Sequence, residues 1–199
     1  MILNLLAFFF LASAPNLQAA LPPQFTDCMN DNSGTSLSTA DMKEISKVSN
    51  LTVCQNQINL LSKYDAVDLL KSPNVKMGIS LARTGFTRTD LMDMAKSGTY
   101  VLYVDTAVLD KTFIMDLQRA GVQIVVVSAG AGLTKFDMLD MAKVKPFILN
   151  LNSTMTKEDL RQLVTAGVQV VIRMNQAGLS RSDIIEVAKA NAELVTVMP

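Results

Sequence analysis

The chain has 199 residues, of which 49% are hydrophobic, with 18 basic and 18 acidic side chains and no histidine. A neutral chain without basic clusters argues against binding to nucleic acid or to an anionic membrane surface. The lack of histidine removes the commonest general base and the usual zinc ligand, which disfavours hydrolase and zinc chemistry. We therefore expect no metal and no cofactor, and we predict that the chain is not an enzyme.

Residues 1–20 have the pattern of a secretory signal peptide. An apolar run over residues 5–14 is followed by small residues that end at Ala19 and Ala20. The alternative, a short membrane anchor, is disfavoured because about ten apolar residues are too few to cross a bilayer, which needs about 20. We predict cleavage near Ala19 or Ala20, a secreted or periplasmic location, and no stable membrane insertion after the signal is removed.

Residues 21–37 are predicted to form an N-terminal cap or lead-in, because prolines, asparagines and a Ser-Gly pair mark them as loop. This segment holds Cys28, and Cys54 is the only other cysteine. In an exported protein the two predict one disulfide, which closes a loop of about 26 residues and contributes roughly 3.5 kcal/mol in the chain-entropy model. We interpret it as a clasp on the first repeat; a redox pair is the rival interpretation, although redox cysteines usually lie close together as CxxC.

An internal repeat dominates the rest of the chain. The stretch GLTKFDMLDMAK at residues 132–143 recurs as GFTRTDLMDMAK at 85–96 and as GLSRSDIIEVAK at 178–189, at spacings of 47 and 46 positions. Each copy contains a hydroxyl residue followed by an acid three positions later, the pattern of a helix N-terminal capping box. Such helix starts recur every 22 to 25 residues, with Asp110 as a variant cap: Ser38, Ser62, Thr87, Asp110, Thr134, Thr156 and Ser180.

Each start is followed by about ten residues with helical apolar spacing, a stop such as Gly98, Gly121, Pro146 or Gly167, and a β-branched run. The runs predict strands over residues 100–104, 122–127, 147–151 and 168–172. The sequence therefore predicts one repeat domain over residues 38–199, made of about seven helix–strand units.

Units that all run in one sense predict an α/β fold with a parallel sheet and helices as crossovers. We expect a parallel-strand repeat solenoid, with a small closed α/β barrel as the alternative. Polar residues close most strands: Asn59, Ser80, Asp105, Ser128, Asn152 and Asn175. In unit length, in one strand plus one helix per unit, and in these closing residues, the chain resembles a leucine-rich-repeat solenoid. That resemblance implies a protein-binding scaffold by analogy.

Acidic residues occur in pairs three positions apart in five of the predicted helices: Asp41/Glu44, Asp65/Asp68, Asp90/Asp93, Asp137/Asp140 and Asp183/Glu186. A catalytic or cation-binding role is one interpretation. We favour a structural one, because a motif copied five times serves a need copied five times, and acids are favoured near helix N-termini.

The sheet face turned away from the helices is the candidate functional surface. Aligning the strands on their stop residues assigns twelve residues to it: Tyr100, Leu102, Val104, Gln123, Val125, Val127, Phe147, Leu149, Leu151, Gln169, Val171 and Arg173. A register error of one residue would exchange the two faces. We predict that Tyr100, Gln123, Phe147, Gln169 and Arg173 bind a protein partner or a second copy of the chain. The alternative is an enzyme or small-ligand binder that uses the strand-end rim of a closed barrel.

Overall fold

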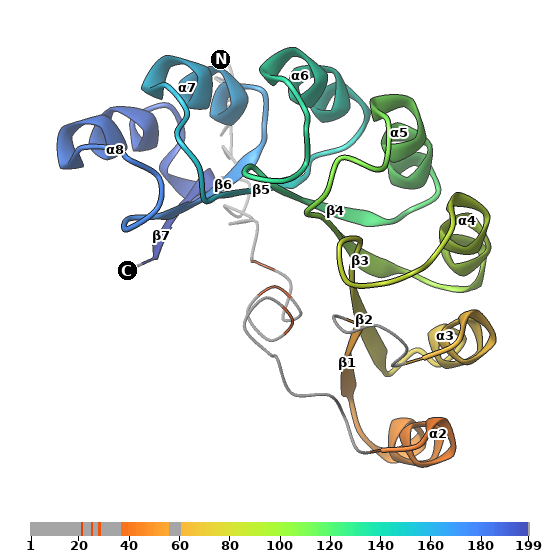
Figure 1. Ribbon diagram of the computed structural model, residues 1–199. Coiled ribbons are helices and arrows are strands. Elements are labelled where there is room, and N and C mark those ends of the chain that lie inside the picture. The colour runs from red at the N-terminus through yellow and green to blue at the C-terminus, as the bar shows by residue number, and fades with distance from the viewer. Residues whose placement is uncertain (1–20, 22–24, 26–27, 29–36, 56–60, 199) are drawn as a thin grey trace, which may run out of the picture.

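The computed structural model describes residues 21, 25, 28, 37–55 and 61–198. Within them, helices and strands alternate along the chain and form an open arc, with the strands on the inside and the helices on the outside (Figure 1). The helices are α2 (Thr39–Val48), α3 (Lys63–Leu70), α4 (Arg88–Ser97), α5 (Lys111–Arg119), α6 (Lys135–Val144), α7 (Lys157–Thr165) and α8 (Arg181–Ala188). The strands are β1 (Leu51–Gln55), β2 (Val75–Ser80), β3 (Tyr100–Val104), β4 (Gln123–Val127), β5 (Ile148–Leu151), β6 (Gln169–Arg173) and β7 (Val195–Met198), the last preceded by the short 3₁₀-helix η1 (Ala192–Leu194).

The strands form one parallel sheet in chain order, from β1 to β7. Each helix is the crossover between neighbouring strands. In the part of the chain that the structure describes, β1 pairs only with β2 and β7 pairs only with β6, so the sheet is not closed. The prediction of a parallel solenoid of seven helix–strand units is confirmed, and the closed-barrel alternative is wrong.

The helices begin where the capping pattern predicts. Ser38, Ser62, Thr87, Asp110, Thr134, Thr156 and Ser180 are the N-caps of α2 to α8, and each side chain accepts the backbone N–H three residues later. In α2, α4, α6 and α8 the acid at that third position, N3, also accepts the N-cap backbone N–H, which completes the capping box. The local hydrogen bonds of each unit therefore fix its helix start independently of its neighbours.

The helix-side core fills the space between the helices and the sheet. Its fully buried members alternate along the strands and recur at helical spacing, as in Leu91 and Met94 of α4 and Ile114 and Leu117 of α5. Burying each such side chain stabilises the fold by roughly 1.5–3 kcal/mol. Because every helix lies on the same side of the sheet, this core runs along the whole arc.

The interior helices end in two different ways. The nine-residue helices α5 and α7 end before Gly121 and Gly167, which have φ of 100° and 90° and reverse the chain. The ten-residue helices α4 and α6 end at Gly98 and Lys145, whose backbones are extended. The two kinds alternate, so the units that hold β3 and β5 have one more residue between helix start and strand than the units that hold β4 and β6.

A ladder of ion pairs joins neighbouring helices on the outside of the arc. The basic residue at the first helical position, N1, pairs with an acid at the start of the next helix. The pairs are Lys63–Asp90 (3.0 Å), Arg88–Asp110 (2.6 Å), Lys111–Asp137 (3.2 Å), Lys135–Asp159 (2.7 Å) and Lys157–Asp183 (3.2 Å). We call these five pairs the inter-repeat ladder.

The second acid of each pair also has a structural contact. Asp93 and Asp140, at the sixth helical position, N6, accept from Lys63 at 2.8 Å and Lys111 at 2.9 Å. Asp68 pairs with Lys43 and thereby joins α2 to α3. These contacts confirm the structural interpretation of the acidic pairs.

We predict that the N-caps contribute locally and alike. Thr87→Ala, Thr134→Ala and Ser180→Ala each remove one cap hydroxyl, and each should lower the free energy of unfolding by about 1 kcal/mol. Urea unfolding of the three variants measures this. A loss well above 2 kcal/mol at one site would show that this hydroxyl does more than cap a helix.

We predict loss of stability in acid through the same aspartates. Hydrogen bonds from Thr87, with Lys63 beside them, lower the pKa of Asp90 to about 2, and Lys143 and Lys111 lower the pKa of Asp140 to about 2. A carboxylate whose pKa is depressed by folding stabilises the fold above its unfolded pKa, near 3.8, and that contribution disappears as the pH falls to about 2. The urea midpoint should therefore fall between about pH 4 and pH 2, less steeply in Asp140→Asn. A midpoint independent of pH in this window would contradict the prediction.

Candidate functional site

The inner, concave face of the sheet carries a second set of side chains, distinct from the helix-side core. Strand pairing places Val101 opposite Gln123 and Tyr103 opposite Val125, and it continues the same face through Ile148 and Val171. We call the buried apolar group on this side the concave-face cluster: Phe25, Cys28, Val101, Tyr103, Val125, Ile148 and Val171. Two of its members come from the N-terminal segment, so the chain covers part of its own concave face.

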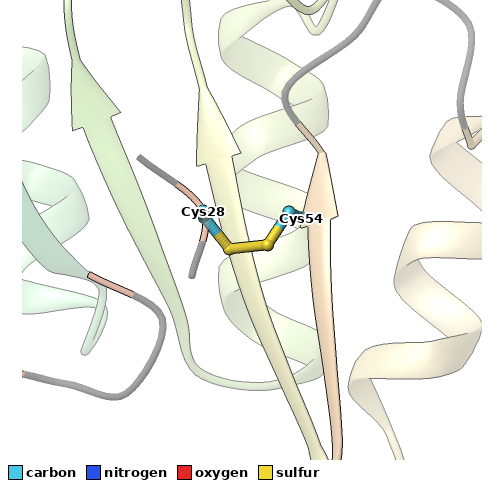
Figure 2. Close-up of a disulfide and its surroundings, with 2 residues drawn as sticks. All are labelled: Cys28 and Cys54. Atoms are coloured by element: carbon cyan, nitrogen blue, oxygen red, sulfur yellow. A yellow bond between two sulfur atoms is a disulfide. The ribbon is translucent and has the colours of Figure 1, made fainter. Parts of the chain in front are cut away.

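Phe25 and Cys28 attach the N-terminal segment to the sheet. The Phe25 side chain is 0% exposed. Cys28 forms a disulfide with Cys54 of β1, with 5.0 Å between their Cα atoms, and Figure 2 shows the bond crossing the face of β2 to reach β1. The structure therefore contains the predicted disulfide, and it holds the segment against the inner surface of the first strands.

Gly78 provides the space for this crossing. It lies on β2, and a Cβ atom at this position would stand 2.7 Å from the sulfur of Cys28. Only a residue without a side chain lets the disulfide pass over the strand at this depth. The cysteine pair and the glycine therefore form one structural unit, although they are far apart in the sequence.

Polar side chains at the carboxyl ends of the strands bind the turns beside them. Asp105 accepts the backbone N–H of Ala82 at 2.8 Å and the hydroxyl of Ser80 at 2.5 Å. Asn152, 47 positions later, accepts the backbone N–H of Ala129 at 3.0 Å and the hydroxyl of Ser128. A neutral amide thus makes the contacts at one turn that a carboxylate makes at the other, so the turn itself does not require the charge of Asp105.

A pocket of about 160 Å³ opens beside Asp105 at the strand-end edge of the concave face. Its wall combines an aromatic ring, two charged side chains and apolar groups, and it includes the Cys28 end of the disulfide. The lining residues are Cys28, Gly78, Ser80, Arg83, Tyr103, Asp105 and Val127. We call this the strand-end pocket.

A second hollow, of about 270 Å³, lies at the opposite edge of the sheet, where the strands begin. Gln123 and Gln169 line it together with Phe147 and Pro146, and its lining contains no charged side chain. Arg173 lies further along β6, where its Nε donates to the side-chain oxygen of the buried Asn150 at 3.3 Å. The predicted binding residues that lie on the concave face are thus spread across it and do not form one site.

Two of the five predicted binding residues are on the wrong face. Tyr100 and Phe147 belong to the helix-side core, where the Tyr100 hydroxyl donates to the carbonyl of Leu91 at 2.8 Å and burial raises the pKa of Tyr100. Gln123, Gln169 and Arg173 lie on the concave face as predicted. The assignment of Leu102, Val104, Leu149 and Leu151 to that face is wrong for the same reason as Tyr100.

The physical reason is the alternation of helix ends. Alignment on the stop residues treats Gly98 and Pro146 as equivalent to Gly121 and Gly167, but the helices before Gly98 and Pro146 are one residue longer. One extra residue turns a strand over. Counting from the helix N-caps reveals the extra residue and places Tyr103 and Asn150 on the concave face, which the prediction missed; Phe25 has no such signal, because it lies outside the repeats.

The fold and this face define the class of protein: an open α/β solenoid with a clasped concave sheet. In comparisons of its sequence, no family model matches the chain and no curated protein matches it. Among the described residues, no helix is long and apolar enough to cross a membrane. The same residues hold no group of three or more acidic or cysteine side chains placed to bind a metal ion. The signal peptide predicted over residues 1–20 and the strand-closing Asn59 lie outside the described residues.

We predict that Phe25 anchors the N-terminal segment. Phe25→Ala should lower the free energy of unfolding by about 3–5 kcal/mol, the usual loss for a buried phenylalanine, because it removes the ring from the concave-face cluster. Phe136→Ala is the matched control, since Phe136 is 71% exposed on α6 and its loss should cost under about 1 kcal/mol. Equal effects of the two variants in urea unfolding would show that the segment is not anchored by this ring.

Proposed function

We propose that the chain is an exported, non-enzymatic binding module that engages a protein partner with the concave face of its sheet. The observation that supports this most is the strand-end pocket, where an aromatic ring, an arginine and a carboxylate converge at an accessible edge. Tyrosine and arginine are the residue types that most often dominate the energy of protein interfaces.

The size of the pocket favours a protein side chain over a small molecule. Sites for drug-sized ligands usually enclose about 300–1,000 Å³, and the strand-end pocket holds about 160 Å³. That volume suits one side chain of a partner, with the remainder of the partner lying on the surrounding face. The alternative, a small-ligand binder or enzyme at the rim of a closed barrel, loses its structural premise because the sheet is open.

Asp105 supports a recognition role for the pocket. The comparison with Asn152 shows that an amide suffices to bind the turn, so the carboxylate adds a charge beyond what the fold uses. Arg83, which is exposed, lines the same pocket. A charged pair in a small, partly apolar recess gives specificity for a complementary side chain.

The two other parts of the proposal rest on the sequence. The signal-like leader, together with the Cys28–Cys54 disulfide, supports an exported location, because disulfides persist in oxidising compartments. The resemblance to leucine-rich-repeat solenoids supports a protein partner by analogy. Gln123, Gln169 and Arg173 remain proposed contacts on the face around the pocket.

We predict that a photo-crosslinking residue at position 83 captures a discrete protein partner. The exported protein would carry the crosslinker at position 83 in one sample and, as a matched control, at Arg161 on the outside of α7 in the other. We expect a defined adduct from position 83 and none from position 161. The same adduct from both positions, or adducts with small molecules only, would contradict the proposal.

The captured partner allows a quantitative test on the same pocket. Asp105→Asn should weaken its binding at least tenfold, because it removes the charge and keeps the turn contacts, while the urea midpoint stays near that of the wild type. Asn152→Asp is the reverse change at the equivalent turn outside the pocket, and it should leave the affinity unchanged. Equal affinity of Asp105→Asn and the wild type would remove the pocket from the proposal.

A further inference from the structure

The inter-repeat ladder is incomplete at both ends of the arc. Arg181 is the N1 residue of α8, the position from which Lys63, Lys111 and their equivalents reach the next helix. Its side chain is exposed, and no described residue pairs with it. The last repeat thus presents a cation in the geometry that meets an acid at every interior junction from α3 to α8.

The first repeat presents the matching acids. Asp41 is the N3 residue of α2, and within the described chain its carboxylate binds only Ser38. Glu44 lies at N6, the position of Asp93 and Asp140, and pairs only with Lys47 of its own helix. In the interior, both positions face the preceding helix, which α2 lacks in the described structure.

The apolar contacts follow the same pattern. The fifth helical position, N5, faces the following helix, as the pairing of Lys43 with Asp68 shows. In the interior it holds Val67, Met92, Met115 and Leu139, all partly buried against the helix-side core. In α8 it holds Ile185, which is 47% exposed. The sheet is unfinished as well, because in the described residues β1 and β7 each lack a second neighbouring strand, and Figure 1 shows them at opposite ends of the arc.

We propose that the chain associates head to tail with copies of itself, with the α8–β7 end of one copy stacked on the α2–β1 end of the next. Arg181 then meets Asp41 and Glu44 of the neighbouring copy, Ile185 packs against its α2, and β7 lies parallel to its β1. The contact repeats the junction that the chain already makes between its own units. It goes beyond the binding role of the concave face and uses different residues.

The complementarity of the two ends identifies the occupant as a second copy. One end offers a base and an apolar side chain, and the other offers acids at the spacing that this base meets inside the fold. The two surfaces differ from each other, so the contact is heterologous and leaves a free end at each side of a dimer, which permits longer chains of copies. Because the ion pair is exposed at the rim, added salt should weaken it.

The test uses the full-length chain, expressed with its leader and recovered from the exported fraction. Analytical ultracentrifugation at low salt should show an average mass that rises above one chain as the concentration reaches about 100 µM, where a micromolar Kd gives mostly assembled protein. Arg181→Glu should weaken association at least tenfold. It should not harm α8, because an acid is favoured in the first turn of a helix. Lys143→Glu, an equal charge reversal away from both ends, is the matched control and should associate like the wild type.

Mixing variants distinguishes this contact from a symmetric dimer. Asp41→Arg blocks the α2 end and Arg181→Glu blocks the α8 end, so each alone should be monomeric. Mixed, they retain one compatible pair of ends and should form a dimer of one copy of each, with nothing longer. Since Asp41→Arg also removes a capping acid, Glu44→Arg serves as a second variant that keeps the cap. Wild-type protein that stays monomeric, association unchanged by Arg181→Glu, or a mixture without dimers would overturn the proposal.

Discussion

The structure depends on the acid that begins most of its helices. In α4, α6 and α8 one carboxylate accepts its own N-cap backbone N–H and also receives the N1 base of the preceding helix. The first contact sets where a helix begins, and the second sets how far it lies from its neighbour. An exposed ion pair alone contributes little. Here the capping hydrogen bonds hold the acid in place, so the pair costs less side-chain entropy and fixes the spacing of the units.

That arrangement divides the surface of the molecule into two unlike faces. The outside of the arc satisfies its charges within and between its own helices, as the ladder shows. The inside retains a strip of apolar side chains, because helices that cross over in one sense cover only one face of a sheet. Phe25 and the Cys28–Cys54 bond cover part of that strip. The polar and partly exposed remainder, around Asp105 and Arg173, is therefore the part of the inner face on which a partner can act.

The sequence predicts what is local and misses what depends on length. All seven N-caps could be predicted, because a hydroxyl or carboxylate and the amide three residues later form a complete interaction within four residues. The parallel order of the strands followed from the uniform succession of units. The faces of β3 and β5 could not be assigned from the stop residues, because Gly98 and Gly121 look alike in the sequence but end their helices with different backbone conformations. The candidate site was accordingly found in part: Gln123 and Arg173 lie on the correct face, whereas Tyr103 and Asp105 were not expected to meet at a pocket.

The same length difference explains why the internal repeat spans two units. A ten-residue helix with an extended end and a nine-residue helix with a reversing glycine both bring the apolar side of their strand to the core, each by its own count of residues. Exchanging one kind of end for the other, without changing the strand, would turn that strand over and bury its polar side. A single unit is therefore not interchangeable with its neighbour, whereas a pair of units is interchangeable with the next pair. Strong similarity consequently recurs at 46 and 47 positions, at residues 85–96, 132–143 and 178–189, and the matched turns at Asp105 and Asn152 follow that longer period.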